Sequence, residues 1–139
     1  IKRTLDIFNT DYIHFTYSDS DITAVFDRDQ LGRVVTNLVK NAMQATENTP
    51  MPHIEVSLYK DNDCITLKVK DNGIGIKETD RDKIFEPRFT TKTSGSGLGL
   101  AMVKNIILSY GGTISFTSEV GKGSEFTAVL AHFLKTNQT

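Results

Sequence analysis

The chain has 139 residues and a formal net charge of −1 at pH 7, and acidic and basic side chains are mixed along its whole length. This length is typical of one domain, 1–139, which can bury on the order of two-thirds of its unfolded surface. The charge balance excludes a basic nucleic-acid footprint, and no apolar run reaches the length of a membrane span. A single cysteine, Cys64, excludes an internal disulfide and favours a reducing compartment. Because the chain begins without Met, we expect it to be a piece of a longer protein.

A strand pair and a long helix are predicted in the first third of the chain. Residues 12–17 are rich in β-branched and aromatic side chains, and 22–26 have the same character, so we expect a β-hairpin. Residues 29–46 are predicted to form a helix, because apolar side chains recur there at helical spacing. This predicted core stripe consists of Leu31, Val34, Leu38, Ala42 and Ala45.

Amide side chains form a second stripe on the same helix. Asn37, Asn41 and Gln44 lie roughly a quarter-turn round from the apolar stripe, at about 100° per residue. Two amides one turn apart can point their oxygens into a cleft, where a carboxamide oxygen suits Mg²⁺ beside phosphate. The alternative is two solvent-facing asparagines. Because asparagine is a poor residue for a helix interior, the pattern favours a function.

The next two segments alternate between apolar and polar residues and predict a strand pair at 54–58 and 64–70. Continuing the alternation places Asp71 on the inward side, where a carboxylate needs hydrogen-bond donors. Gly73 and Gly75 follow and permit close approach to the backbone. The arrangement predicts a site for the amino edge of a flat polar ligand. A common D-N-G turn is the alternative.

A glycine-rich loop is predicted to lead into a second helix, at 98–110, after a short helix at 79–85. The loop contains Gly95, Gly97 and Gly99, and its hydrogen-bond donors are Thr91, Lys92, Ser94 and Ser96. A loop of this kind presents free N–H groups and the positive end of the helix dipole to an anion. The alternative is a hinge, although the basic residue and the hydroxyls favour phosphate.

The last predicted elements are strands around 114–116 and 126–130, separated by a turn at 121–123. The second helix, being apolar on most sides, is expected to be well buried. Ser124 shares the inward parity of Phe126, so it is expected to face the same site as Asp71.

Several independent motifs occur in one order along the chain. They are N-L-V-K-N-A at 37–42, D-N-G-I-G at 71–75, F-E-P at 85–87, T-T-K at 90–92, G-S-G-L-G-L at 95–100 and G-K-G-S-E-F at 121–126. Over about residues 22–131, the set resembles the ATP-binding catalytic domain of sensor histidine kinases, within the gyrase, chaperone, histidine-kinase and mismatch-repair ATPase superfamily. The lid and glycine turn look most like the nitrogen-regulation sensor branch.

The resemblance implies an α/β (α+β) two-layer sandwich of the Bergerat type, with a mixed, mostly antiparallel sheet and helices on one face. It implies ATP and Mg²⁺ as cofactors. Asp71 would accept a hydrogen bond from the adenine amino group, helped by Ser124 through a water, and residues 86–97 would be a mobile lid. Asn37, Asn41 and Lys92 are the implied catalytic residues, with Asn41 as the Mg²⁺ ligand. The implied nucleotide-binding residues are Asn37, Asn41, Gln44, Asp71, Gly73, Gly75, Ile76, Thr91, Lys92, Gly95, Gly97, Leu98, Gly99 and Ser124.

The resemblance also implies a protein-histidine kinase in two-component signalling. The γ-phosphoryl group would pass to a histidine on a dimerisation domain of the same or a sister chain, and a response regulator receiver domain would follow indirectly. His14, His53 and His132 lack the acceptor context, a histidine followed by an acid on a long helix. We expect a cytoplasmic domain, with a parent protein that can be membrane-anchored, and no contact of this domain with nucleic acid or membrane.

Some positions depart from the family pattern and keep two other classes open. Many members carry a basic residue at Gln44 and an aromatic one at Ala45, and the lid often has an aromatic at Arg88. The departures at Gln44 and Ala45 fit a nucleotide-binding regulatory module without turnover. Arg88 would face either phosphate or a partner. An ATP-hydrolysing clamp is the other class, but clamps carry a glutamate where this chain has Asn37, and an amide cannot act as a base.

Overall fold

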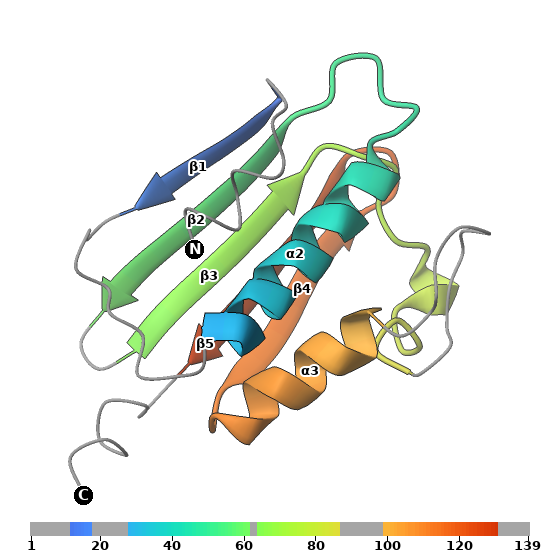
Figure 1. Cartoon of the computed structure of the whole chain (residues 1–139). Helices are drawn as coiled ribbons and strands as arrows, with labels where there is room; N and C mark the ends of the chain where they lie inside the picture. The colour runs from blue at the N-terminus through green and yellow to red at the C-terminus, as the bar shows by residue number, and fades with distance from the viewer. Residues whose placement is uncertain (1–11, 18–27, 62–63, 87–98, 131–139) are drawn as a thin grey trace, which may run out of the picture.

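The computed structural model describes residues 12–17, 28–61, 64–86 and 99–130. Its helices and strands are, in order, β1 (Ile13–Tyr17), α2 (Arg28–Ala45), β2 (Ile54–Asp61), β3 (Cys64–Asp71), the 3₁₀ turn η1 (Glu78–Asp80), α3 (Gly99–Ser109), β4 (Thr113–Glu119) and β5 (Gly123–Leu130). The strands form one five-stranded sheet in the order β1-β2-β3-β5-β4. Figure 1 shows α2 and α3 on the same face of this sheet.

The sheet is mixed and mostly antiparallel, as predicted. β1 runs parallel to β2, whereas β2–β3, β3–β5 and β5–β4 are antiparallel pairs. The hairpin predicted between 64–70 and the strand before it is confirmed, because Asp61 pairs with Cys64. The strand at 12–17 is also confirmed, but its predicted partner at 22–26 lies outside the described residues. The strand that the structure pairs with β1 is β2.

The core lies between the sheet and the two helices. Alternate residues of the three central strands are buried there: Ile54, Val56, Leu58, Ile65, Leu67, Val69, Phe126, Ala128 and Leu130. On α2, the predicted Val34, Leu38 and Ala42 are buried, and Ala45 is half-buried. Val35 and Val39, which the predicted stripe omitted, are fully buried too. The buried arc of α2 is wider than one stripe because the helix packs against both the sheet and α3.

Two predictions for the later elements were wrong in detail. The helix expected at 79–85 is the short 3₁₀ turn η1 followed by turns, in which Lys83 N–H bonds to Asp80 O and Glu86 N–H to Lys83 O. Hydrogen bonds that reach back three residues, rather than four, do not build an α-helix.

The helix predicted at 98–110 is observed as α3, but it is not buried on most sides. Leu108 is 51% exposed, and Lys104 and Asn105 are also exposed. Only one face of α3, with Ala101, Val103, Ile106 and Ile107, is buried. In the described part of the chain, no helix has the length and apolar character that crossing a membrane requires.

Candidate functional site

Asp71 ends β3 as a buried carboxylate on the helix-covered face of the sheet. Its side chain is 4% exposed, so the inward direction predicted from the alternation is confirmed. Burial raises the pKa of this carboxyl group above 3.8, while hydrogen bonds from the backbone N–H groups of Gly73 and Ser124 act to lower it. The Gly73 nitrogen lies 2.9 Å from Asp71 Oδ1. The result is a fixed, desolvated acceptor at the end of the strand.

The two glycines after Asp71 are needed by the chain's own backbone. A Cβ at Gly73 would lie 2.3 Å from the carbonyl oxygen of Ala45, at the end of α2, and the next residue, Ile74, donates its N–H to that oxygen. Gly75 has a φ of +76° and would place a Cβ 2.4 Å from Glu119 O. The loop is therefore pressed between α2 and the β4–β5 turn. That a flat ligand approaches the backbone at these two glycines stays a prediction.

A row of polar residues crosses three strands at this end of the sheet. Asp71 pairs with Ser124 on β5, and Ser124 pairs with Ser118 on β4. Ser124 is 7% exposed, which confirms its predicted inward direction. Its hydroxyl oxygen lies 2.8 Å from that of Ser118. The sequence analysis missed Ser118, although it shares the inward parity of Ile114 and Phe116 and could have been found from that signal.

Asn72 is a second residue that the sequence analysis missed. Its amide nitrogen donates to Met51 O at 2.8 Å, and its amide oxygen accepts the N–H of His53, also at 2.8 Å. The loop after α2 is thereby fixed to the end of β3. The only sequence signal for this role is the middle position of the D-N-G turn.

The amide stripe of α2 lies beside the start of α3. Asn37, Asn41 and Gln44 are all half-buried. Asn37 donates its Nδ2 to Arg33 O at 2.7 Å, and its Oδ1 lies 3.0 Å from the point where a Cβ on Gly99 would be. The Asn41 side chain makes no hydrogen bond within the described part of the chain. Asn37 therefore lies beside the N-terminal end of α3, and Asn41 lies one turn further along α2.

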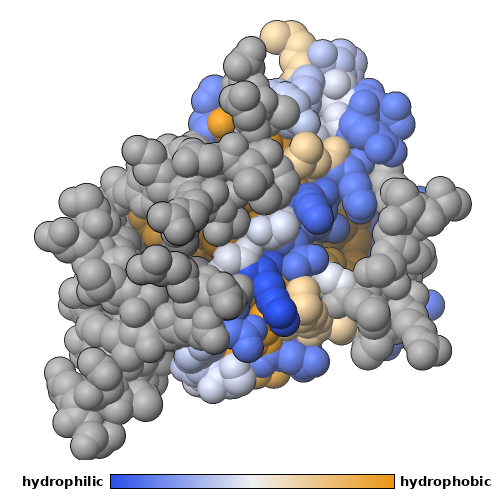
Figure 2. Space-filling view, in the orientation of Figure 1, coloured by the Kyte–Doolittle hydropathy of each residue, from blue (hydrophilic) through white to orange (hydrophobic). Residues whose placement is uncertain are grey.

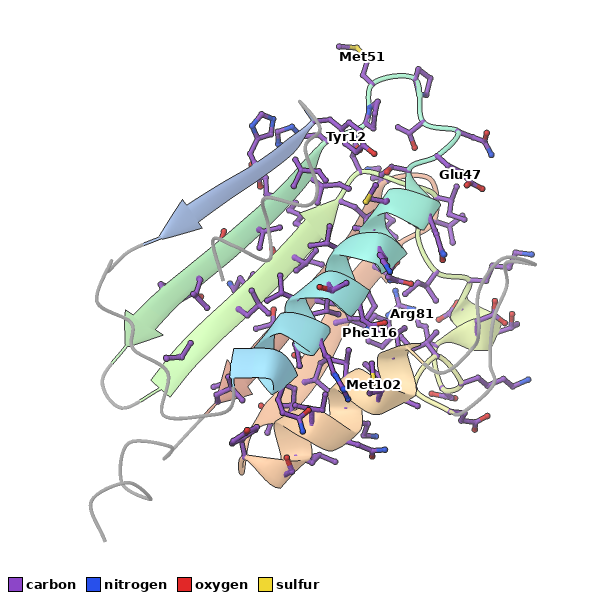
Figure 3. All side chains as sticks on the ribbon, viewed as in Figure 1. Tyr12, Glu47, Met51, Arg81, Met102 and Phe116 are labelled. Carbon is purple, nitrogen blue, oxygen red and sulfur yellow. The ribbon has the colours of Figure 1, made fainter. Side chains whose placement is uncertain are left out.

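Aromatic side chains pack under the segment that follows the glycines. Phe85 packs edge-on against Phe116 and Phe126, with ring centroids 6.0 and 6.3 Å apart. Arg81 lies over the Phe116 ring, 5.6 Å from its centroid, and donates to the carbonyl of Ser118. Figure 3 shows Arg81 and Phe116 close together. The turn from 78 to 86 is thereby attached to β4, beside the polar row.

Part of the predicted site lies outside the described residues. This holds for Thr91, Lys92, Gly95, Gly97 and Leu98, for Arg88 and His132, and for the predicted lid apart from Glu86. Gly99 begins α3, and Ile76 is half-buried with its N–H directed to Ser118 Oγ. The described residues contain no cluster of three His, Cys, Asp or Glu side chains suited to a metal ion. The role of Asn41 as a metal ligand stays a prediction.

The described residues offer hydrogen-bond acceptors at one end of the site and amide side chains at the other. The acceptor end is the Asp71–Ser124 pair, and the amide end is α2 beside the first turn of α3. Figure 2 shows hydrophilic side chains over α2 through the middle of this face. A flat polar group joined to phosphates matches both ends.

Comparison with known proteins assigns the chain to a family. Residues 26–133 match the family of histidine kinase-, DNA gyrase B- and HSP90-like ATPases. The sensor histidine kinase ZraS of Escherichia coli (strain K12) is 42% identical over 115 residues, which cover 83% of this chain and 24% of ZraS. Sporulation kinase B of Bacillus subtilis (strain 168) is 34% identical over 81% of this chain and 26% of its own length. The chain thus spans about a quarter of the length of these relatives.

Solved structures have the same fold. The catalytic domain of the histidine kinase ThkA, in a nucleotide-free form, has a TM-score of 0.80 at 30% identity over 94% of this chain and 88% of that one. Full-length ShkA in complex with AMPPNP has a TM-score of 0.73 at 26% identity over 93% of this chain and 28% of that one.

The fold and the matches define a Bergerat-type ATPase domain. The chain belongs to the histidine kinase-, gyrase B- and HSP90-like ATPase family, and within it to the catalytic domains of protein-histidine kinases.

Proposed function

We propose that this domain binds Mg·ATP between α2 and the end of β3 and donates the γ-phosphoryl group to a histidine on a separate dimerisation domain. The observation that carries the proposal is Asp71, a 4% exposed carboxylate at a strand end, with its acceptor side fixed by the Gly73 N–H. A buried acceptor of this kind suits the exocyclic amino group of adenine. The structural relative ShkA was solved in complex with AMPPNP, which supports a nucleotide as the ligand of this domain.

At the other end, Asn41 would hold Mg²⁺, and Asn37 would lie beside it, towards the phosphates. The N-terminal turn of α3, which begins at Gly99 next to Asn37, supplies backbone N–H groups for phosphate oxygens. The metal would neutralise charge on the phosphates. In the transfer, an imidazole nitrogen forms a bond to the γ-phosphorus while the bond to the β–γ bridging oxygen breaks, and ADP leaves. The domain acts by positioning and charge neutralisation, so it needs no general base.

A phosphotransfer assay tests the proposal. Labelled ATP, Mg²⁺ and the domain are mixed with a separate helical domain that carries the acceptor histidine. We expect acid-labile phosphate on the helical domain, which disappears when Mg²⁺ is removed. ATP binding without any transfer would favour a regulatory module, and rapid phosphate release without transfer would favour a hydrolytic clamp.

The metal site has its own test. Asn41→Ala should weaken binding of Mg·ATP by about tenfold or more, but leave metal-free ADP binding nearly unchanged, because only the metal contact is lost. Isothermal titration calorimetry measures both affinities. Asn105→Ala, an exposed asparagine on α3, is the matched control and should change neither. Equal losses for both ligands in Asn41→Ala would show that the residue only shapes the pocket.

A further inference from the structure

Ser118 lies at the β4 end of the polar row that contains Asp71 and Ser124. Two residues away on the same strands, in the next row on this face of the sheet, Val69, Phe126 and Phe116 form an apolar row. The polar row therefore marks the point where the core ends and the candidate site begins. A hydroxyl in such a row needs partners, because a buried polar group without one is costly.

Ser118 is held through both its side chain and its main chain. Its Oγ accepts the N–H of Ile76 at 2.8 Å, and the same atom lies 2.8 Å from Ser124 Oγ and 3.2 Å from Gly123 O. The carbonyl of Ser118 accepts a hydrogen bond from Arg81. The loop after Asp71, the turn at 78–86 and β5 all meet at this residue.

The number of protons decides how Ser124 is oriented. A serine hydroxyl has one proton to donate and two lone pairs to accept with. Ile76 uses one lone pair of Ser118, and the carbonyl of Gly123 can only accept. All three contacts are satisfied together only when Ser118 donates to Gly123 O and accepts the proton of Ser124. Ser124 then has only lone pairs left for the site.

We propose that Ser118 is a positioning residue that holds Ser124 as a hydrogen-bond acceptor and so sets the base preference of the site. The inference rests on the proposed nucleotide function. With ionised Asp71 and Ser124 both accepting, this end of the site matches a 6-amino purine, whose amino group donates twice. The oxo group of a 6-oxo purine is itself a hydrogen-bond acceptor and would face the acceptor atoms of Asp71 and Ser124. These polar groups would stay unpaired, so the site should bind a 6-oxo purine much more weakly.

The test compares ATP with ITP, which replaces the 6-amino group by an oxo group and protonates N1. The measured quantity is the ratio Kd(ITP)/Kd(ATP), from calorimetry with Mg²⁺. Without the Ser118 hydroxyl, Ser124 is free to rotate and donate to the oxo group, so Ser118→Ala should lower the ratio by about fivefold, the size expected for one hydrogen bond. Ser118→Thr keeps a hydroxyl and should restore the ratio. Ser115→Ala, at an exposed position of the same strand, is the matched control.

Each outcome has a separate meaning. If Ser118→Ala weakens both nucleotides equally, or changes neither, the proposal is overturned, because a purely structural role would not move the ratio. If that variant does not fold, Ser124→Ala replaces it: a lowered ratio supports the proposal, and an unchanged ratio overturns it. If the unmodified domain binds neither nucleotide, the proposed function fails instead.

Discussion

The Asp71 carboxylate lowers the stability of the free domain but offers a hydrogen-bond acceptor to a ligand. Its carboxyl group is almost fully buried, and burial raises its pKa although two backbone N–H groups oppose the shift. Keeping this group ionised near neutral pH therefore costs stability in the free domain. Among the described residues no cation pairs with this carboxylate, so a ligand that supplies a further donor would stabilise it. The residue is thus better explained by binding than by folding.

Asp71→Asn should separate these two effects. The native pKa is raised, so the stability contributed by Asp71 is complete below the unfolded pKa and is lost as pH rises through the native pKa. The free energy of unfolding of the variant minus that of the wild type should therefore increase between about pH 4 and about pH 7. ATP binding should weaken by about 2 kcal/mol or more, since a charge-assisted hydrogen bond is lost.

Urea denaturation at the two pH values measures the first effect, and calorimetry measures the second. Asp82→Asn, at an exposed carboxylate, is the control for both. A stability difference that does not change with pH would show that burial does not perturb Asp71, and unchanged ATP binding by the folded variant would falsify its role with adenine.

At the residue scale, the sequence predicted to which face of the sheet a side chain points better than it predicted which residues that side chain contacts. Strand alternation correctly placed Asp71 and Ser124 inward, since the period of a strand is fixed by its geometry. It could not show that Asn72 binds the loop at 51–53, because that contact joins segments about twenty residues apart. Ser118 was missed although its parity was readable, because an isolated serine has no chemistry until its neighbours are known.

At the scale of elements, the end of α2 is fixed to the end of β3. Gly73 permits this contact, because any Cβ there would meet the carbonyl of Ala45 at 2.3 Å, and Ile74 bonds to the same carbonyl. The contact positions the amide stripe of α2 relative to Asp71. The relative position of the two ends of the candidate site thus depends on the close contact between the backbones of Gly73 and Ala45.

Gly73→Ala should destabilise the domain by about 2 kcal/mol or more, because backbone must shift to relieve the overlap. Gly121→Ala is the matched control: its φ is +83°, but a Cβ there meets nothing within 4 Å, so only about 1 kcal/mol of backbone strain is expected. Thermal and urea unfolding measure both variants. Equal losses would contradict the proposed packing of α2 against the loop.

The Asn72 amide provides a further attachment, between the loop that follows α2 and the end of β3. Asn72→Ala removes two hydrogen bonds and leaves Met51 O and the His53 N–H without this partner, so we expect about 1–3 kcal/mol of destabilisation. The exposed Asn105→Ala should cost nothing, since alanine is the better helix former. Chemical denaturation distinguishes the two. A neutral Asn72→Ala would mean that water replaces both bonds without loss.

Element types were predictable wherever the hydrophobic period was long. α2, β3 and α3 were each found within one residue at either end, because their patterns repeat over several turns or strand residues. β2 was also found, but it runs three residues beyond the predicted 54–58. The segment at 79–85 has no such repeat. Ile84 is buried and Arg81 is bonded to β4, so tertiary contacts decide its turns. The parallel pairing of β1 with β2 was also beyond local pattern, since it joins segments far apart in sequence.

At the scale of the whole molecule, the candidate site and the described histidines lie on opposite faces of the sheet. Ile13 and Ile54 face the helices, so the alternation directs His14 and His53 to the other face. Their rings lie 4.8 Å apart there, and His53 contacts Glu55 at 3.2 Å. A phosphoryl group held between α2 and β3 is therefore shielded from both histidines by the sheet itself.

The isolated chain should consequently bind ATP without labelling itself or hydrolysing it rapidly. Neither described histidine can reach the site, and Asn37 offers an amide, committed to Arg33 O, where a hydrolase would need a carboxylate to activate water. Positioning two reactants supplies roughly 7–11 kcal/mol of a barrier, and neither described histidine is positioned as the second reactant. Labelled ATP should leave no acid-labile phosphate on the chain, and phosphate release should stay far below that of a dedicated ATPase. His14→Gln and His53→Gln should change neither result, whereas label on either histidine would show that the chain contains its own acceptor.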